Sequence, residues 1–217
     1  MLRIIICGYN PGNKLQMCLA SVEMQTMRDF KISLSIDQEP RKYLLKNTID
    51  TARECRADSD DVFVFLDADD WLADENAFEI IQNAYEDSSR LLLTYGSYCN
   101  LSDNKKGKFC GPYLPGEDFA ASQWRGSHLK TMKKKLFDAI PEDRFKDEDE
   151  KYFKCCADRA LMIPAMELAG YERIKWVETI LYCYNDLNPA SCWKTNRELS
   201  IKTRQYISSR RPLGRLP

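Results

Sequence analysis

The chain lacks several features that would assign it directly to a class of protein. It has a single histidine, His128, and no Cys-x-x-Cys pair, which excludes the paired spacing of a zinc site. Its formal net charge of −1 gives no electrostatic sign of nucleic-acid binding. No apolar run is long enough to cross a bilayer, so we expect no membrane span. Neither a Gly-x-Gly-x-x-Gly nor a Gly-x-x-x-x-Gly-Lys-Ser/Thr loop occurs, which argues against dinucleotide Rossmann and P-loop sites.

The composition is that of an ordinary soluble domain. The chain has 217 residues, 44% apolar and 30% charged, enough for one large domain with a core. Met1 leads almost directly into a strand-like Ile4–Ile6, so we expect no signal peptide and a cytoplasmic location. The nine cysteines include Cys7, Cys18 and Cys183 in apolar segments, and we expect reduced, buried thiols.

The first half alternates strand and helix patterns with short links. This order predicts parallel βαβ units with right-handed crossovers. The expected fold class is therefore α/β, with a mostly parallel central sheet flanked by helices. The expected strands are Arg3–Cys7, Phe30–Ile36, Val62–Leu66 and Leu91–Tyr95, and the expected helices are Asn13–Gln25, Arg41–Arg56 and Ala73–Asp87.

The second half is less regular. Residues 1–208 are expected to form a single domain, and 209–217 a basic tail or the start of a linker after which further domains could follow. Pro164 is expected to kink or end a helix. The remaining expectations are a loop-rich Asn100–Gln123, helices at Leu129–Ala139, Asp147–Leu168 and Thr195–Ser208, and short strands at Ile174–Val177 and Ile180–Tyr184.

The most informative segment is Val62–Leu72, a buried-strand pattern that ends in three carboxylates. Asp67, Asp69 and Asp70 follow the strand at the sheet edge where α/β proteins bind ligands. Carboxylates this close repel one another unless a cation or hydrogen-bond donors compensate. An oxygen-rich site suits Mn²⁺ or Mg²⁺ bridging to a diphosphate. The alternative is a solvated acidic turn, with Asp70 as the cap of the helix Ala73–Asp87.

An ordered set of segments carries a family resemblance over nearly the whole chain. The chain resembles family-2-type glycosyltransferases of the GT-A fold. The matching segments are Ile4–Asn10, Ser35–Asp37, Phe65–Asp70, Ala157–Leu161 followed by Leu168–Gly170, and Ile180–Asn185. Lys134–Asp138 before Ile140 is similar to small viral members, which would place the protein in the host cytosol. The resemblance implies a metal-dependent, inverting transfer of a hexose from a nucleoside-diphosphate sugar, with a UDP-sugar favoured, to a hydroxyl of a carbohydrate or glycoprotein.

The resemblance also implies roles for residues in the first half. Asp37 would accept a hydrogen bond from the uracil N–H, unless it only forms the turn before Pro40. Lys46 stands where the family usually has Arg, so the planar guanidinium fork is lost. Tyr9 could stack on the base or ribose, or simply pack in a structural turn. The implied nucleotide-sugar contacts here are Gly8, Tyr9, Asn10, Asp37, Lys46, Asn47, Asp67, Ala68 and Asp69, with Asp67 and Asp69 also holding the metal.

In the second half, Asp158 is the candidate general base that takes the proton of the acceptor hydroxyl. The family pattern is Glu-Asp, and Ala157 replaces the Glu; Asp158 could instead form a salt bridge with Arg159 or a lysine. His128 could contact substrate or metal, or lie in the core. Lys194, in a loop expected to close over the diphosphate, could neutralise phosphate charge.

Two other functions remain open at this stage. A sugar-nucleotide pyrophosphorylase would share the layout but needs a basic, Gly-rich loop after the first strand, where residues 8–16 supply only Lys14. A non-catalytic nucleotide-sugar-binding domain would keep Asp37 and Asp67 without needing Asp158. Tyr184–Leu187 replaces the family's Tyr-Arg-x-His pattern, so a third protein ligand to the metal is not identified.

Overall fold

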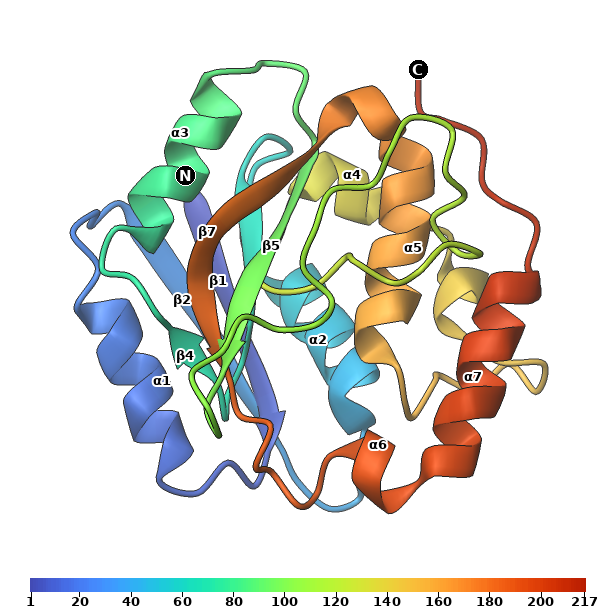
Figure 1. The fold of residues 1–217 in the computed structure, drawn as a ribbon, viewed down its shortest axis with the longest axis horizontal. Coiled ribbons are helices and arrows are strands. Elements are labelled where there is room, and N and C mark those ends of the chain that lie inside the picture. Colours follow the sequence, from blue (N-terminus) through green and yellow to red (C-terminus); the bar gives the residue numbers. More distant parts are fainter.

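A seven-stranded sheet runs through the middle of the protein in a computed structural model that describes residues 1–217 (Figure 1). Its strand order is β2-β1-β3-β6-β5-β7-β4. β1 pairs in parallel with β2 and β3, and β5 with β7, whereas β6 and β4 are antiparallel to their neighbours. The strands are β1 (Leu2–Tyr9), β2 (Phe30–Asp37), β3 (Val62–Asp67), β4 (Trp71–Leu72), β5 (Leu93–Asn100), β6 (Lys130–Lys133) and β7 (Ile174–Tyr184).

Helices cover both faces of this sheet. α1 and α3 pack on one face, and α2, α4, α5 and α7 lie on the other side (Figure 1). The helices are α1 (Lys14–Glu23), α2 (Tyr43–Glu54), α3 (Ala77–Glu86), α4 (Lys134–Asp138), α5 (Ala157–Ala169), α6 (Cys192–Thr195) and α7 (Arg197–Ser209), with 3-10 turns η1 (Glu142–Phe145) and η2 (Tyr171–Arg173). This three-layer architecture is that of a Rossmann-like GT-A fold and confirms the predicted class.

The apolar run of β1 is explained by burial on both faces. Ile4 and Ile6 belong to the core beneath α1 and α3, while Ile5 and Cys7 belong to the core beneath α2 and α5. Successive side chains of a strand point to opposite faces, so a central strand between two helical layers needs apolar residues at every position. β3 divides in the same way, with Val64 in one core and Phe65 in the other.

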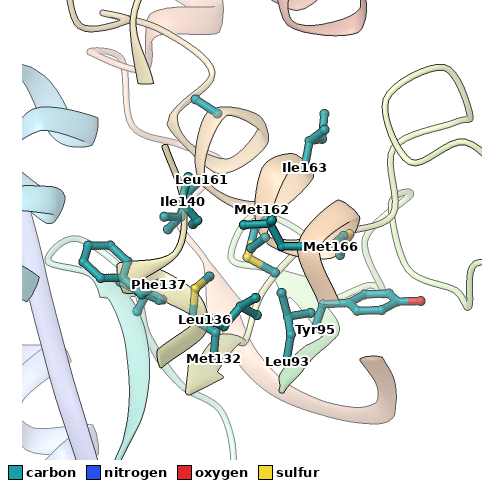
Figure 2. Packing of buried hydrophobic residues seen from close by; sticks show 14 of the residues in the cluster. Leu93, Tyr95, Met132, Leu136, Phe137, Ile140, Leu161, Met162, Ile163 and Met166 are labelled. Atoms are coloured by element: carbon teal, nitrogen blue, oxygen red, sulfur yellow. The ribbon is translucent and has the colours of Figure 1, made fainter. Parts of the chain in front are cut away.

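Helix α5 is the central element of the larger core. All of its residues from Ala160 to Ala169 are buried. Figure 2 shows Met162 and Met166 of α5 packed close to Leu93 of β5 and Met132 of β6. Pro164 lies inside α5, and the helix continues to Ala169, so this proline marks no boundary.

Two predicted helices were wrong in part. Residues 129–139 form β6 followed by the short α4, because β6 fills the sheet between β3 and β5 and tertiary pairing overrides the helical pattern. Of Asp147–Leu168, only the part from Ala157 is helical; the Asp147 carboxylate instead accepts the N–H groups of Asp149 and Lys151 in a turn. The two strands expected near the end are one strand, β7.

The last residues lie against the domain. The guanidinium of Arg173 donates hydrogen bonds to the carbonyls of Leu216 and Pro217, at 2.6 and 3.2 Å. The N–H of Leu213 donates to the buried Glu167 carboxylate at 3.0 Å. Residues 210–217 therefore contact α5 and η2 directly. None of the helices combines the length and the apolar character that a membrane crossing needs.

The cysteines follow the sequence prediction except at one pair. Cys7, Cys18 and Cys183 are buried and unpaired, as expected. Cys155 and Cys192, 37 residues apart with Cα atoms separated by 5.8 Å, form a disulfide. This corrects the expectation that all cysteines are reduced. The pair is far apart in sequence and meets only because α6 lies at the start of α5. A cytoplasmic location stays a prediction.

Candidate active site

The carboxyl ends of β1, β2 and β3 meet at one edge of the sheet. The strand register places Tyr9 beside Asp37 and Cys7 beside Asp67. A cavity of about 310 Å³ opens at this edge. The residues that line it from the predicted set are Gly8, Tyr9, Asp67, Asp69 and Asp158, so the ends of β1 and β3, the turn after β3 and the start of α5 converge on one space.

Gly8 is required by the packing beneath the cavity. A Cβ atom at Gly8 would lie 2.6 Å from the Cβ of Ala68, well inside contact distance. Ala68 is fully buried, so it supports the backbone of Gly8 from below. The pair lets the β1 backbone form an open floor where a ligand can approach closely. Asn10, with φ of 47°, is exposed in the following turn.

One end of the cavity is aromatic. The guanidinium of Arg41 lies 3.8 Å from the ring centroid of Tyr9 and 4.9 Å from that of Tyr43. The Tyr9 hydroxyl donates a hydrogen bond to Glu39 at 2.9 Å, which fixes the ring. All three of Tyr9, Arg41 and Tyr43 line the cavity, and together they offer flat surfaces of the kind on which a base can stack.

Three other predicted residues of this region have partners within the protein. Asp37 is buried, and its oxygens accept the N–H groups of Lys42 and Tyr43 at 3.0 and 2.9 Å, as the turn-forming alternative predicts. The Asn47 amide donates to the carbonyl of Ser35 at 3.0 Å. Lys46 pairs with Asp50. The cavity wall includes none of the three, and their contacts with a nucleotide stay predictions.

The three carboxylates at the end of β3 and in the turn after it have different environments. Asp70 is buried and accepts hydrogen bonds from the Tyr182 hydroxyl at 2.6 Å and the Asn185 N–H at 2.7 Å. It therefore anchors the end of β7 and does not cap α3, whose N-cap is Asn76; this corrects the capping alternative. Asp69 accepts from the Asn188 amide at 2.6 Å.

The carboxyl group of Asp67 lies where burial disfavours its ionised form. Burial raises its pKa to about 7, and the neighbouring Asp158 and Asp69 add to the rise, against the opposing charge of Lys130. Near neutral pH the group is thus poised between its two forms. A cation bound at this edge would favour the ionised form.

A buried lysine that sequence reasoning missed completes the site. Lys130 of β6 is 3% exposed, and its ammonium donates to Oδ1 of Asp158. Burial disfavours this ammonium, but the charges of Asp158 and Asp67 outweigh burial and raise the pKa of Lys130. Burial would likewise raise the pKa of Asp158, yet Lys130 lowers it to about 2. Both partners are ionised. The available signal, a lysine two residues after His128, becomes meaningful only once β6 is known to pair with β3.

His128 lies beside the Lys130–Asp158 ion pair. It is buried, stacks on Tyr182 with ring centroids 4.3 Å apart, and holds Nε2 3.9 Å from Oδ2 of Asp158. Burial and the Lys130 charge lower its pKa to about 3, so the imidazole is neutral. Its Nδ1 has no partner. Ligand atoms of Asp67, His128 and Asp158 lie within 4.8 Å of one another, close enough to share a cation.

The segment after β7 borders the cavity. Asn185, Asn188 and the exposed Trp193 line it. Lys194 is exposed, and its ammonium donates to the carbonyl of Asp186 at 2.5 Å. The Cys155–Cys192 disulfide ties this segment to the start of α5. The predicted phosphate contact of Lys194 stays a prediction.

Comparison with known proteins finds similarity in structure only. No family model matches the sequence, and no curated protein matches it. The structure is similar to that of S. aureus TarS, with a TM-score of 0.58 and 13% identity over 93% of this chain and 39% of that one. It is similar to S. aureus TarS 1-349 in complex with UDP, with a TM-score of 0.63 and 12% identity over 93% of this chain and 64% of that one. The UDP-GlcNAc complex of TarS 1-349 gives a TM-score of 0.55 and 14% identity over 85% of this chain and 58% of that one.

These likenesses concern the arrangement of helices and strands. The chain spans between 39% and 64% of the length of the TarS chains it matches. At such low identity, similarity of structure does not establish a shared activity. The comparisons therefore show the GT-A-like fold, and the function must be inferred from the cavity itself.

Proposed function

We propose that this protein is a metal-dependent, inverting glycosyltransferase. It would transfer a hexose from a nucleoside-diphosphate sugar, most readily a UDP-sugar, to a hydroxyl of a glycan or glycoprotein. The observation that carries the proposal is the convergence of Tyr9, Asp67, Asp69 and Asp158 on one cavity at the carboxyl edge of the sheet. The TarS structures of the same fold, which belong to a glycosyltransferase and contain UDP or UDP-GlcNAc, support it.

The aromatic end of the cavity would receive the nucleoside. Tyr9 and Tyr43 offer ring faces, and Arg41, which lies against both, would shift to make room for the base or to meet the diphosphate. Asp37 lies beside Tyr9 in the strand register. Its oxygens keep free lone pairs beyond the two backbone bonds, so one of them could still accept the uracil N3–H.

The residues present fit a divalent cation such as Mn²⁺ or Mg²⁺. Asp67 and Asp69 offer carboxylates in the cavity wall, and Asn188 adds an amide beside Asp69. Burial, with a smaller effect of the Asp158 and Asp69 charges, raises the pKa of Asp67, and a bound cation would favour its ionised form. When bound, the ion would supply charge stabilisation for the departing diphosphate.

Asp158 would accept the proton of the attacking hydroxyl. Its Oδ1 is held by Lys130, while the side chain remains 37% exposed and so can reach the acceptor. A carboxylate with a pKa of about 2 is a weak base in the free protein. The negative charge of a bound diphosphate would raise that pKa and bring it nearer to working pH.

Calorimetry and transfer assays test the proposal. UDP should bind more tightly with Mn²⁺ than with EDTA, and Asp69→Asn should lower the metal-dependent affinity on the order of tenfold. Asp158→Asn should keep donor affinity but reduce donor hydrolysis and transfer by roughly 10²–10⁴-fold. Asp60→Asn, which removes an exposed carboxylate elsewhere, is the matched control. Metal-independent binding would refute the metal role, and full activity in Asp158→Asn would remove the proposed base.

A further inference from the structure

Two arginines on the neighbouring helices α5 and α7 have no acidic partner. Arg159 follows Asp158 on the first turn of α5, and Arg204 lies on α7. Neither guanidinium has a carboxylate oxygen within 4.0 Å or donates a hydrogen bond, and the Nε of Arg204 is a buried polar atom with no partner. The nearest carboxylate to Arg159 in sequence, Asp158, is already paired with Lys130.

The two arginines belong to one surface. α5 and α7 lie side by side (Figure 1), and the Cys156 thiol contacts the carbonyl of Ser200, one helical turn before Arg204. Burial, followed by the charge of Arg204, lowers the pKa of Arg159. Burial raises the pKa of the Cys156 thiol to about 11, and both arginines act against that rise. Like charges this close repel each other unless an anion compensates.

Aromatic rings frame the pair. Arg159 lies 5.0 Å from the ring centroid of Trp124, and Arg204 lies 5.0 Å from that of Trp193. Trp193 is 48% exposed and lines the main cavity together with Cys156 and Asp158. The surface therefore combines exposed indole, which suits the apolar face of a sugar, with guanidinium forks, which suit a carboxylate or phosphate.

We propose that the acceptor is an anionic carbohydrate, whose carboxylate or phosphate group binds between Arg159 and Arg204 while Trp193 contacts a sugar ring. This inference rests on the proposed transferase function and specifies its acceptor. Arg159 directly follows Asp158, the candidate base, in the chain, and Trp193, against which Arg204 lies, lines the same cavity as Asp158. The nucleoside end of that cavity is formed instead by Tyr9, Arg41 and Tyr43. A bound oxyanion here belongs to the molecule that loses its proton to Asp158. It is not the donor diphosphate.

Binding measurements that need no turnover test the acceptor site. Mannose 6-phosphate and glucuronic acid would be titrated into the protein by NMR, with methyl mannoside as the neutral probe, first without nucleotide and then with saturating UDP. We expect at least one charged sugar to bind at least about tenfold more tightly than the neutral one in both conditions. Arg159→Gln and Arg204→Gln should each remove this preference and leave UDP affinity unchanged. Lys202→Gln, which removes a surface charge of α7 paired with Glu198, should change neither.

The possible outcomes separate the two proposals. If neither charged sugar is preferred, or if the preference survives in both arginine variants, the acceptor site is refuted whatever UDP does. If the arginine variants lose UDP affinity instead, the pair serves the donor diphosphate and the inference fails. If UDP does not bind the wild type while the arginine-dependent preference is present, the anion site stands and the transferase function fails.

Discussion

Removing the ammonium of Lys130 is the most direct test of how the site is held together. In Lys130→Met the side chain keeps much of its volume, but Asp158 and Asp67 lose the only buried cation beside them. Breaking a buried ion pair by deleting one partner costs about 3–5 kcal/mol. Because the Asp158 side chain is 37% exposed and water screens it in part, we take the lower end, about 3 kcal/mol. For a chain of this size the midpoint of thermal unfolding should fall by roughly 6–12 °C.

The pH dependence provides a second readout. Lys130 lowers the pKa of Asp158 to about 2 in the folded protein, below its usual 3.8. The stability this gives is present above pH 3.8 and is lost as the pH falls toward 2. Burial raises the pKa of Asp67 to about 7, so Asp67 becomes protonated below pH 7. Its repulsion with Asp158 then disappears, and the positive charge of Lys130 is needed less to offset it. The gap in stability between wild type and Lys130→Met should therefore narrow as the pH falls.

Urea unfolding at pH 7 and pH 3 measures this gap. Lys133→Met, on the same strand and paired with the exposed Asp60, is the control and should cost no more than about 1 kcal/mol. Adding Asp158→Asn to Lys130→Met should restore part of the loss, because the uncompensated charge is removed. The reasoning would be refuted if the free energies of unfolding of Lys130→Met and wild type differed by less than about 1 kcal/mol at pH 7, or if their difference did not change with pH.

Three further predictions address the rest of the site. Gly8→Ala should destabilise the protein by about 1–3 kcal/mol and weaken UDP binding, because the new Cβ would clash with that of Ala68. Adding Ala68→Gly to this variant should recover stability, and equal urea midpoints for Gly8→Ala and wild type would contradict the prediction. Folding lowers the pKa of His128 from 6.5 to about 3, so the stability provided by the neutral imidazole is lost as the pH falls below 6.5. Between pH 7.5 and pH 5 the free energy of unfolding should fall by about 2 kcal/mol more in wild type than in His128→Phe. Equal losses in urea titrations of the two proteins would contradict this. Denatured, unreduced protein should show seven reactive thiols and reduced protein nine; nine in both would exclude the Cys155–Cys192 disulfide.

The local pattern of the first half was enough to predict its fold. β1 and β3 are apolar at successive positions because each packs against two layers of helix, and a sequence records that requirement directly. The position of Asp67 and Asp69 followed from the same pattern, since a buried strand must deliver the residues after it to the edge of the sheet. Asp158 was proposed as the base by resemblance and by its place in a helical pattern, and its position in the cavity wall leaves that role a prediction. All of these features depend on neighbours within a few residues.

Only the tertiary structure decided which groups compensate the charges of these residues. β6 was predicted as a helix, and its antiparallel pairing with β3 is what brings Lys130 and His128 to Asp158. Asp70 resembles its neighbours in sequence, yet contacts from β7 bury it and make it structural. Cys155 bonds to Cys192, and the Cys156 thiol contacts the carbonyl of Ser200, across segments far apart in the chain. Local periodicity specifies which face of an element is buried, but charge compensation depends on which elements pack together, and that is determined only when the whole chain folds.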